Sequence, residues 1–187
     1  MAEQRDFTEV QAFLARFNTT APKRRSRVAA QAPVRQLQEG ALHHADPFVR
    51  RRCLAFLDHY ASDASAHVFA QALADPVEPV RHIALHAIAC ETCRTDALCA
   101  ADVVPHLVAI LAADPSVEVR HKTIPILLRL ADRDARARDA IKRAVDEDPD
   151  ELLREVASRA LVGQHIRPRR AYERHARRRP PGTPATK

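Results

Sequence analysis

The stretch Asp114-Pro-Ser-Val-Glu-Val-Arg120 recurs along the chain in three further copies, and this recurrence decides the fold class. The other copies are Asp46-Pro-Phe-Val-Arg50, Asp75-Pro-Val-Glu-Pro-Val-Arg81 and Asp148-Pro-Asp-Glu-Leu-Leu-Arg154. Each copy follows one apolar stretch with helical spacing and precedes another. The four arginines are 31, 39 and 34 residues apart, a period typical of stacked helical repeats.

An Asp-Pro pair is a helix start signal. The Asp carboxylate accepts hydrogen bonds from the free amide groups of the first turn, and proline fits the first helical position because its missing N–H has no partner there. In a stacked array each arginine would lie near the capping aspartate of a neighbouring repeat. We therefore expect a structural ladder made of Asp46, Asp75, Asp114 and Asp148 with Arg50, Arg81, Arg120 and Arg154.

The helical stretches arrange themselves in pairs. Apolar spacing predicts an N-terminal helix over 8–17, then a basic linker, then helices over 34–44 and 47–60, 64–74 and 76–90, 103–113 and 115–131, and 135–146 and 149–163. Only 3 glycines and 4% aromatic residues disfavour a sheet-rich fold. We predict an all-α protein, a right-handed α-solenoid of about four helix pairs with an extra N-terminal helix. Its parts are an N-terminal helix and linker (1–33), a repeat array (34–164) and a basic tail (165–187).

The recurring Asp-Pro start resembles the HEAT-repeat superfamily, specifically the short bacterial HEAT-like repeats also seen in phycobilin lyase subunits, over roughly residues 34–163. The resemblance implies a scaffold or adaptor that binds a protein. Deoxyhypusine hydroxylase resembles this array but binds two irons through repeated His-Glu pairs, and this sequence has no His-Glu dipeptide. The HEAT-like DNA glycosylases use a basic concave face with Trp or Tyr, whereas this chain has no Trp. A glycosylase is therefore only an alternative.

Three of the four cysteines lie in the longest interval between repeats, at 90–99. His86 precedes Cys90 by one helical turn, so His86, Cys90, Cys93 and Cys99 form a candidate Cys₃His set for one structural Zn²⁺. Two other interpretations stay open: cysteines that pack as small apolar residues, and a redox-active dithiol. Cys53 is predicted to lie in the core.

The net charge of +6 is unevenly distributed. Residues 165–187 carry +7, residues 1–40 carry +3, and residues 41–164 carry −4. The composition of the proline-rich tail predicts a disordered basic segment. Such a segment attracts nucleic acid weakly through phosphate contacts. Its arginines are Arg167, Arg169, Arg170, Arg174, Arg177, Arg178 and Arg179.

The chain shows no export signal and no run of about 18 apolar residues, which favours a cytoplasmic location without a membrane partner. No residue is assigned a catalytic role. The interpretation that fits these patterns is a non-enzymatic scaffold that binds a protein of unknown identity along its second helices. The column that directly follows each ladder arginine is a candidate contact surface, formed by Arg51, His82, His121 and Glu155.

Overall fold

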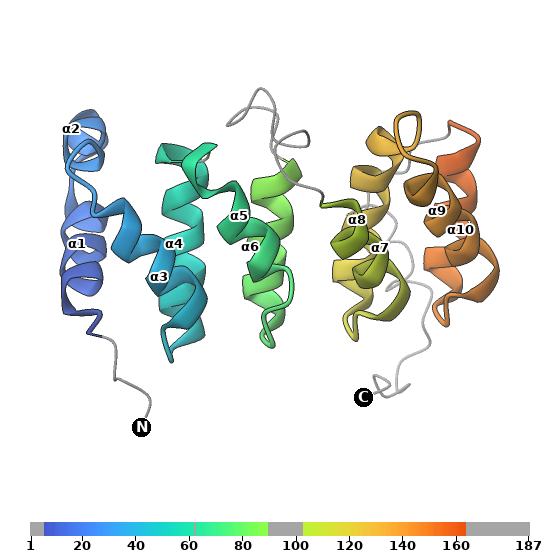
Figure 1. Ribbon diagram of the computed structural model, residues 1–187, viewed down its shortest axis with the longest axis horizontal. Coiled ribbons are helices and arrows are strands. Elements are labelled where there is room, and N and C mark those ends of the chain that lie inside the picture. The colour runs from blue at the N-terminus through green and yellow to red at the C-terminus, as the bar shows by residue number, and fades with distance from the viewer. Residues whose placement is uncertain (1–5, 62, 90–102, 164–187) are drawn as a thin grey trace, which may run out of the picture. The chain divides into compact units, whose positions relative to one another are not determined.

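The computed structural model describes residues 6–61, 63–89 and 103–163. Within these ranges the chain forms ten α-helices and two short 3-10 segments, and no β-strand (Figure 1). The prediction of an all-α protein is therefore confirmed. The chain divides into two compact units, residues 1–103 and 104–187, and each is described separately.

The first unit stacks two helix pairs in two layers. Helix α3 packs on α4 and α5 packs on α6, while α3 also contacts α5 and α4 contacts α6. The fully buried side chains include Leu37, Leu54 and Phe69. Its elements are α1 (Thr8–Thr19), η1 (Pro22–Arg24), α2 (Arg25–Ala29), α3 (Val34–His43), α4 (Pro47–Tyr60), η2 (Asp63–Ser65), α5 (Ala66–Ala72) and α6 (Glu78–Ala89).

Helix α1 packs on this unit through aromatic side chains. The ring of Phe56 in α4 meets Phe13 and Phe17 of α1 edge-on, with both centroids 5.0 Å away. The ring centroid of Tyr60 lies 5.2 Å from that of Phe17. The predicted N-terminal helix thus forms. The segment between it and Val34, expected as a linker, instead contains η1 and the short helix α2.

The second unit repeats the two-layer arrangement. Helix α7 (Val104–Ala113) packs on α8 (Val117–Leu130), and α9 (Ala135–Glu147) packs on α10 (Glu151–Leu161). Contacts between α7 and α9 and between α8 and α10 complete the two layers. Leu107, Ile124 and Leu153 are fully buried. Pro125 lies inside α8, as the sequence places it.

The helix starts differ from the Asp-Pro prediction in the three later copies. In the first of these, α6 begins at Glu78, so Asp75 lies too early to be its N-cap. Asp46 does cap α4, accepting a hydrogen bond from Phe48 N at 2.8 Å. Ser116 caps α8 and Asp150 caps α10, so Asp114 and Asp148 are not N-caps. The later copies have two more residues between Asp and Arg than the first, and these form a turn that ends at the cap. Each of the three later aspartates accepts a hydrogen bond from the amide two residues ahead, at 2.8, 2.8 and 2.9 Å for Asp75, Asp114 and Asp148.

Candidate functional site

Arg50 joins the two helix pairs of the first unit through a buried ion pair. Its Nε donates to Asp75 Oδ2 at 2.7 Å and its Nη2 donates to Asp75 Oδ1 at 2.9 Å. We call this pair of parallel bonds an Arg–Asp fork. The hydrogen bond with Asp75 raises the pKa of the Arg50 guanidinium in spite of its burial. Charge-assisted bidentate bonds of this kind fix orientation as well as adding energy.

The second unit contains the same joint. Nε of Arg120 donates to Asp148 Oδ2 at 2.8 Å, and Nη2 donates to Asp148 Oδ1 at 2.9 Å. Nη1 of Arg120 donates to the carbonyl oxygen of Asp114 at 2.8 Å. Both side chains of the fork are more than nine-tenths buried. In each unit, therefore, an arginine of one repeat forms a bidentate ion pair with the aspartate of the following repeat.

All four ladder arginines share one further bond, which defines their register. Nη1 of each donates to the carbonyl oxygen six residues earlier, at distances of 2.7–2.9 Å. We therefore define the ladder position as the residue six before the arginine, which coincides with the Asp-Pro aspartate in the three later copies but not in the first. In the later copies that residue is Asp75, Asp114 or Asp148, but in the first copy it is His44. Asp46 instead corresponds to the cap position.

His44 occupies the ladder position of the first repeat and contacts α1. Its Nδ1 accepts a hydrogen bond from Asp46 N at 3.0 Å, as each ladder aspartate accepts one from the amide two residues ahead. Its Nε2 lies 3.0 Å from Gln11 Nε2, and its ring centroid lies 5.1 Å from that of Phe7. Sequence reasoning missed His44. Counting six residues back from Arg50 is the signal that finds it.

The exposed side of α4 combines an aromatic ring with unpaired cations. Phe48 is 56% exposed, and the guanidinium of Arg52 lies 5.4 Å from its ring centroid. Arg51 is exposed on the same side of the helix. Neither Arg51 nor Arg52 forms an ion pair with any of the described residues. We call Phe48, Arg51, Arg52 and His59 the α4 face.

The candidate column after the ladder arginines does not form one exposed surface. Arg51 and Glu155 are exposed and His82 is half-buried, but His121 is completely buried. Burial lowers the pKa of His121, and the nearby charges of Asp150 and Glu118 oppose this effect. The expectation that His121 lies at a contact surface is wrong, because this position lies on the buried side of α8.

Of the candidate zinc ligands, the structure places only His86. Its side chain is 56% exposed near the end of α6, and its Nε2 lies 3.5 Å from Oδ2 of the fully buried Asp58. Neither carboxylate oxygen of Asp58 accepts a hydrogen bond from a described residue. Cys90, Cys93 and Cys99 lie outside the described residues. Among those that are described, no group of three or more His, Cys, Asp or Glu side chains is arranged to hold a metal ion.

Cys53 lies in the core, as predicted, and is completely buried. Burial raises the pKa of its thiol to about 12. The neutral thiol packs against Gly40, where a Cβ atom would approach Sγ to 3.2 Å. Cys53 therefore acts as a small apolar residue and not as a nucleophile.

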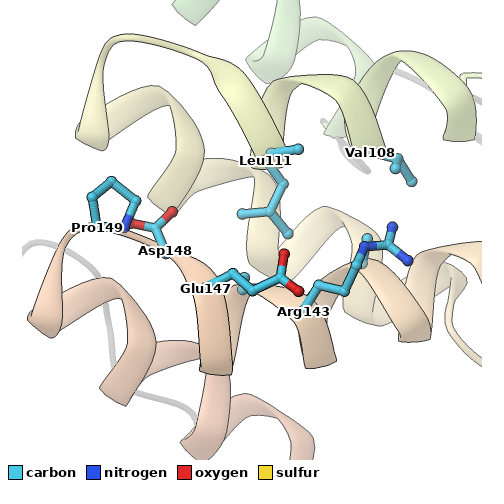
Figure 2. Close-up of a pocket in the computed structure, with 9 residues that line it drawn as sticks. Val108, Leu111, Arg143, Glu147, Asp148 and Pro149 are labelled. Carbon is cyan, nitrogen blue, oxygen red and sulfur yellow. The ribbon is translucent and has the colours of Figure 1, made fainter.

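A small pocket lies between α7 and α9 in the second unit (Figure 2). Val108 and Leu111 line it from α7, and Arg143 and Glu147 line it from α9. Its volume is about 130 Å³. Ligand sites for drug-sized molecules usually measure about 300–1,000 Å³. The pocket is therefore too small to enclose a nucleotide or an organic cofactor.

No protein-family model matches the chain, and comparison with curated proteins gives no match either. None of the described helices is long and apolar enough to cross a membrane. The arginines of the predicted basic tail, residues 165–187, lie outside the described residues.

Proposed function

We propose that the protein is a non-enzymatic helical-repeat scaffold that binds an acidic protein surface through the α4 face. The observation that carries this proposal is the exposed ring of Phe48 beneath Arg52, next to the unpaired Arg51. Aromatic and arginine side chains are enriched among the residues that dominate binding energy at protein interfaces. An acidic partner would supply the carboxylates that these arginines do not find within the described chain.

The use of charge in the repeats supports the same proposal. Several exposed cations on the second unit pair with nearby acids, as Lys142 does with Asp139 and Arg138 with Asp132. The buried arginines Arg50 and Arg120 are committed to forks. Arg51 and Arg52 of the α4 face differ from these cations because neither has a carboxylate partner among the described residues. Joining both units into one continuous HEAT-like solenoid is part of this proposal.

Affinity capture with charge-reversed variants tests the proposal. The tagged full chain is incubated with an extract of the source cells, and the bound proteins are quantified by mass spectrometry. Arg51→Glu with Arg52→Glu should remove at least one acidic protein from the captured set. The matched control, Arg27→Glu with Arg35→Glu, makes the same charge change at exposed sites of the same unit and should retain it. An identical captured set for both double variants would refute the α4 face as the binding site.

A structural zinc ion in the 90–99 segment remains a proposal for the same scaffold. His86 near the end of α6 is half-exposed, as a ligand shared with the following cysteines needs to be. Four protein ligands would leave no open position for substrate, so the ion would stabilise rather than catalyse. Elemental analysis of untagged protein, compared with Cys90→Ser and Cys93→Ser, tests this: about one zinc per chain, lost in both variants, is expected. Protein without metal, or a reversible disulfide between these cysteines, would refute it.

Nucleic-acid binding by the basic tail is the alternative function, and the charge of +7 over residues 165–187 favours it. Binding of this kind falls steeply with added salt. A gel shift with the full chain and with a chain ending at residue 164 distinguishes the alternatives. A salt-sensitive shift that is lost on truncation would support the tail as a nucleic-acid site. The absence of any shift at low salt would refute it.

A further inference from the structure

Arg154 has the environment of a ladder arginine without its aspartate. Its Nη1 donates to the carbonyl oxygen of Asp148 at 2.7 Å, the bond that also orients Arg120 on Asp114. Nε and Nη2 of Arg120 then grip Asp148. No described residue accepts a hydrogen bond from Nε or Nη2 of Arg154, and the side chain is only half-buried.

The positions that follow Arg154 along the same face of α10 are also more exposed than their counterparts in other repeats. In the two repeats that have a described fork, the residues four and seven positions after the fork arginine are buried: Leu54 and Leu57 after Arg50, Ile124 and Leu127 after Arg120. In α10 these positions are Ser158, which is exposed, and Leu161, which is half-buried. Val162 beside them is 68% exposed. The helix face that is covered next to Arg50 and Arg120 therefore has a counterpart on α10, and no described residue covers that counterpart.

We propose that Arg154 and this face of α10 dock a helical hairpin of a different protein, whose turn presents an aspartate to Nε and Nη2. The two forks described above each receive a carboxylate from a turn that precedes a helix, and these internal precedents indicate the chemistry of the ligand. Bidentate geometry selects a carboxylate with both oxygens accessible. The inference rests on the proposed scaffold function and names a second contact surface for it.

Two other occupants fit the fork less well. The chain's own tail, residues 165–187, contains eight Lys and Arg residues but only one acid, Glu173, so its charge repels an arginine site. A second copy of the chain would offer His44 at the start of its ladder, where the later repeats have aspartate. That histidine is already engaged with Asp46, Gln11 and Phe7. A different protein is therefore the occupant that the chemistry favours.

An extended chain tests whether the Arg154 end receives such a hairpin. A copy of residues 130–163, which spans one repeat, is inserted after Gly163. The copied aspartate then follows Arg154 by 28 residues, the separation between Arg120 and Asp148. Because the hairpin is tethered, its effective concentration is high and a weak contact is still detected. The midpoint of thermal unfolding is measured by circular dichroism for the natural and the extended chain.

We expect Arg154→Ala to lower the midpoint by roughly 5–10 °C in the extended chain and by about 1 °C or less in the natural one. Replacing the copied aspartate by asparagine should have an effect similar to that of Arg154→Ala, and combining both changes should add little. The control Arg159→Ala breaks only an ion pair with Glu155 on the same helix, so its effect should be equal in both chains.

Three results would overturn the inference. Equal effects of Arg154→Ala in both chains would mean that the fork is empty in both or already filled by the tail. A concentration-dependent dimer of the natural chain that Arg154→Ala dissociates would identify a second copy as the occupant. If replacing the copied aspartate by asparagine leaves the unfolding midpoint of the extended chain unchanged, a docked hairpin is ruled out. None of these results depends on the α4 face, so they leave the capture experiment on Arg51 and Arg52 unaffected.

Discussion

His44 holds in the first repeat the position that Asp75 holds in the second. The carbonyl oxygen of each accepts from an arginine Nη1 six residues ahead, at 2.8 Å for His44 and 2.9 Å for Asp75. The side chain of each accepts from the amide two residues ahead, at 3.0 and 2.8 Å. Of the two, Asp75 receives an arginine fork, whereas the ring of His44 lies beside Gln11 and Phe7. Among the described residues, this ladder position therefore carries an imidazole where the later repeats carry a carboxylate.

The Arg120–Asp148 fork should dominate the stability of the second unit. Asp148→Asn keeps the shape of the side chain but leaves the buried guanidinium without its counter-charge, which costs about 3–5 kcal/mol of unfolding free energy. Chemical denaturation monitored by circular dichroism measures the loss. The control Lys142→Ala removes an exposed ion pair with Asp139 and should cost about 0.5 kcal/mol or less. A loss for Asp148→Asn as small as for the control would show that the fork does not hold the repeats together.

The stability of the chain should fall as the pH drops from about 7 to 5, partly because of His121. Burial lowers the pKa of this imidazole in the folded state, whereas in the unfolded chain it titrates near its usual value of about 6.5. The unfolded state therefore takes up the proton first, so the stabilisation is complete above that value and is lost as the pH falls towards the lowered pKa. Denaturation midpoints across this range measure the effect.

His121→Leu should flatten this pH dependence, because it removes the buried group that must stay neutral. His67→Gln changes an exposed histidine of the first unit and should retain the slope of the natural chain. If His121→Leu and the natural chain lose stability in parallel between pH 7 and 5, His121 does not titrate as its burial requires.

The thiol of Cys53 should not react with a thiol reagent while the chain is folded. Its pKa of about 12 leaves almost no thiolate at pH 8, and the side chain is completely buried. The variant with Cys90, Cys93 and Cys99 all replaced by serine isolates this thiol. Titration with a chromogenic disulfide should detect no thiol under native conditions and one per chain in denaturant. Rapid reaction under native conditions would show that the core around Gly40 opens.

Much of the fold could be predicted from the sequence, because local patterns determine helices. Apolar spacing located α1 and α3–α10 to within a few residues. The short helix α2 was missed because its five residues contain no repeating apolar stripe. The caps of α8 and α10 were misplaced because Asp-Pro was taken as the helix start, although Ser116 and Asp150 lie closer to the first turn.

The candidate site was harder to predict because burial depends on tertiary packing. His121 and Arg51 occupy the same place after a ladder arginine, yet one is completely buried and the other is exposed. No sequence pattern distinguishes them, since neighbouring helices decide which side of a helix is covered. The pairing of Arg50 with Asp75 followed from the repeat, whereas the uncovered Phe48 became visible only in the packed unit.

Site-specific photo-cross-linking at position 48 tests the proposed binding surface most directly. Phe48 is replaced by benzoylphenylalanine in the full chain, and position 67, exposed on α5 of the same unit, serves as the control. We expect a cross-link to an acidic protein from position 48 that is absent from position 67 and is lost on Arg51→Glu with Arg52→Glu. Adducts that are the same at both positions, or that persist after charge reversal, would contradict the α4 face as a protein-binding surface.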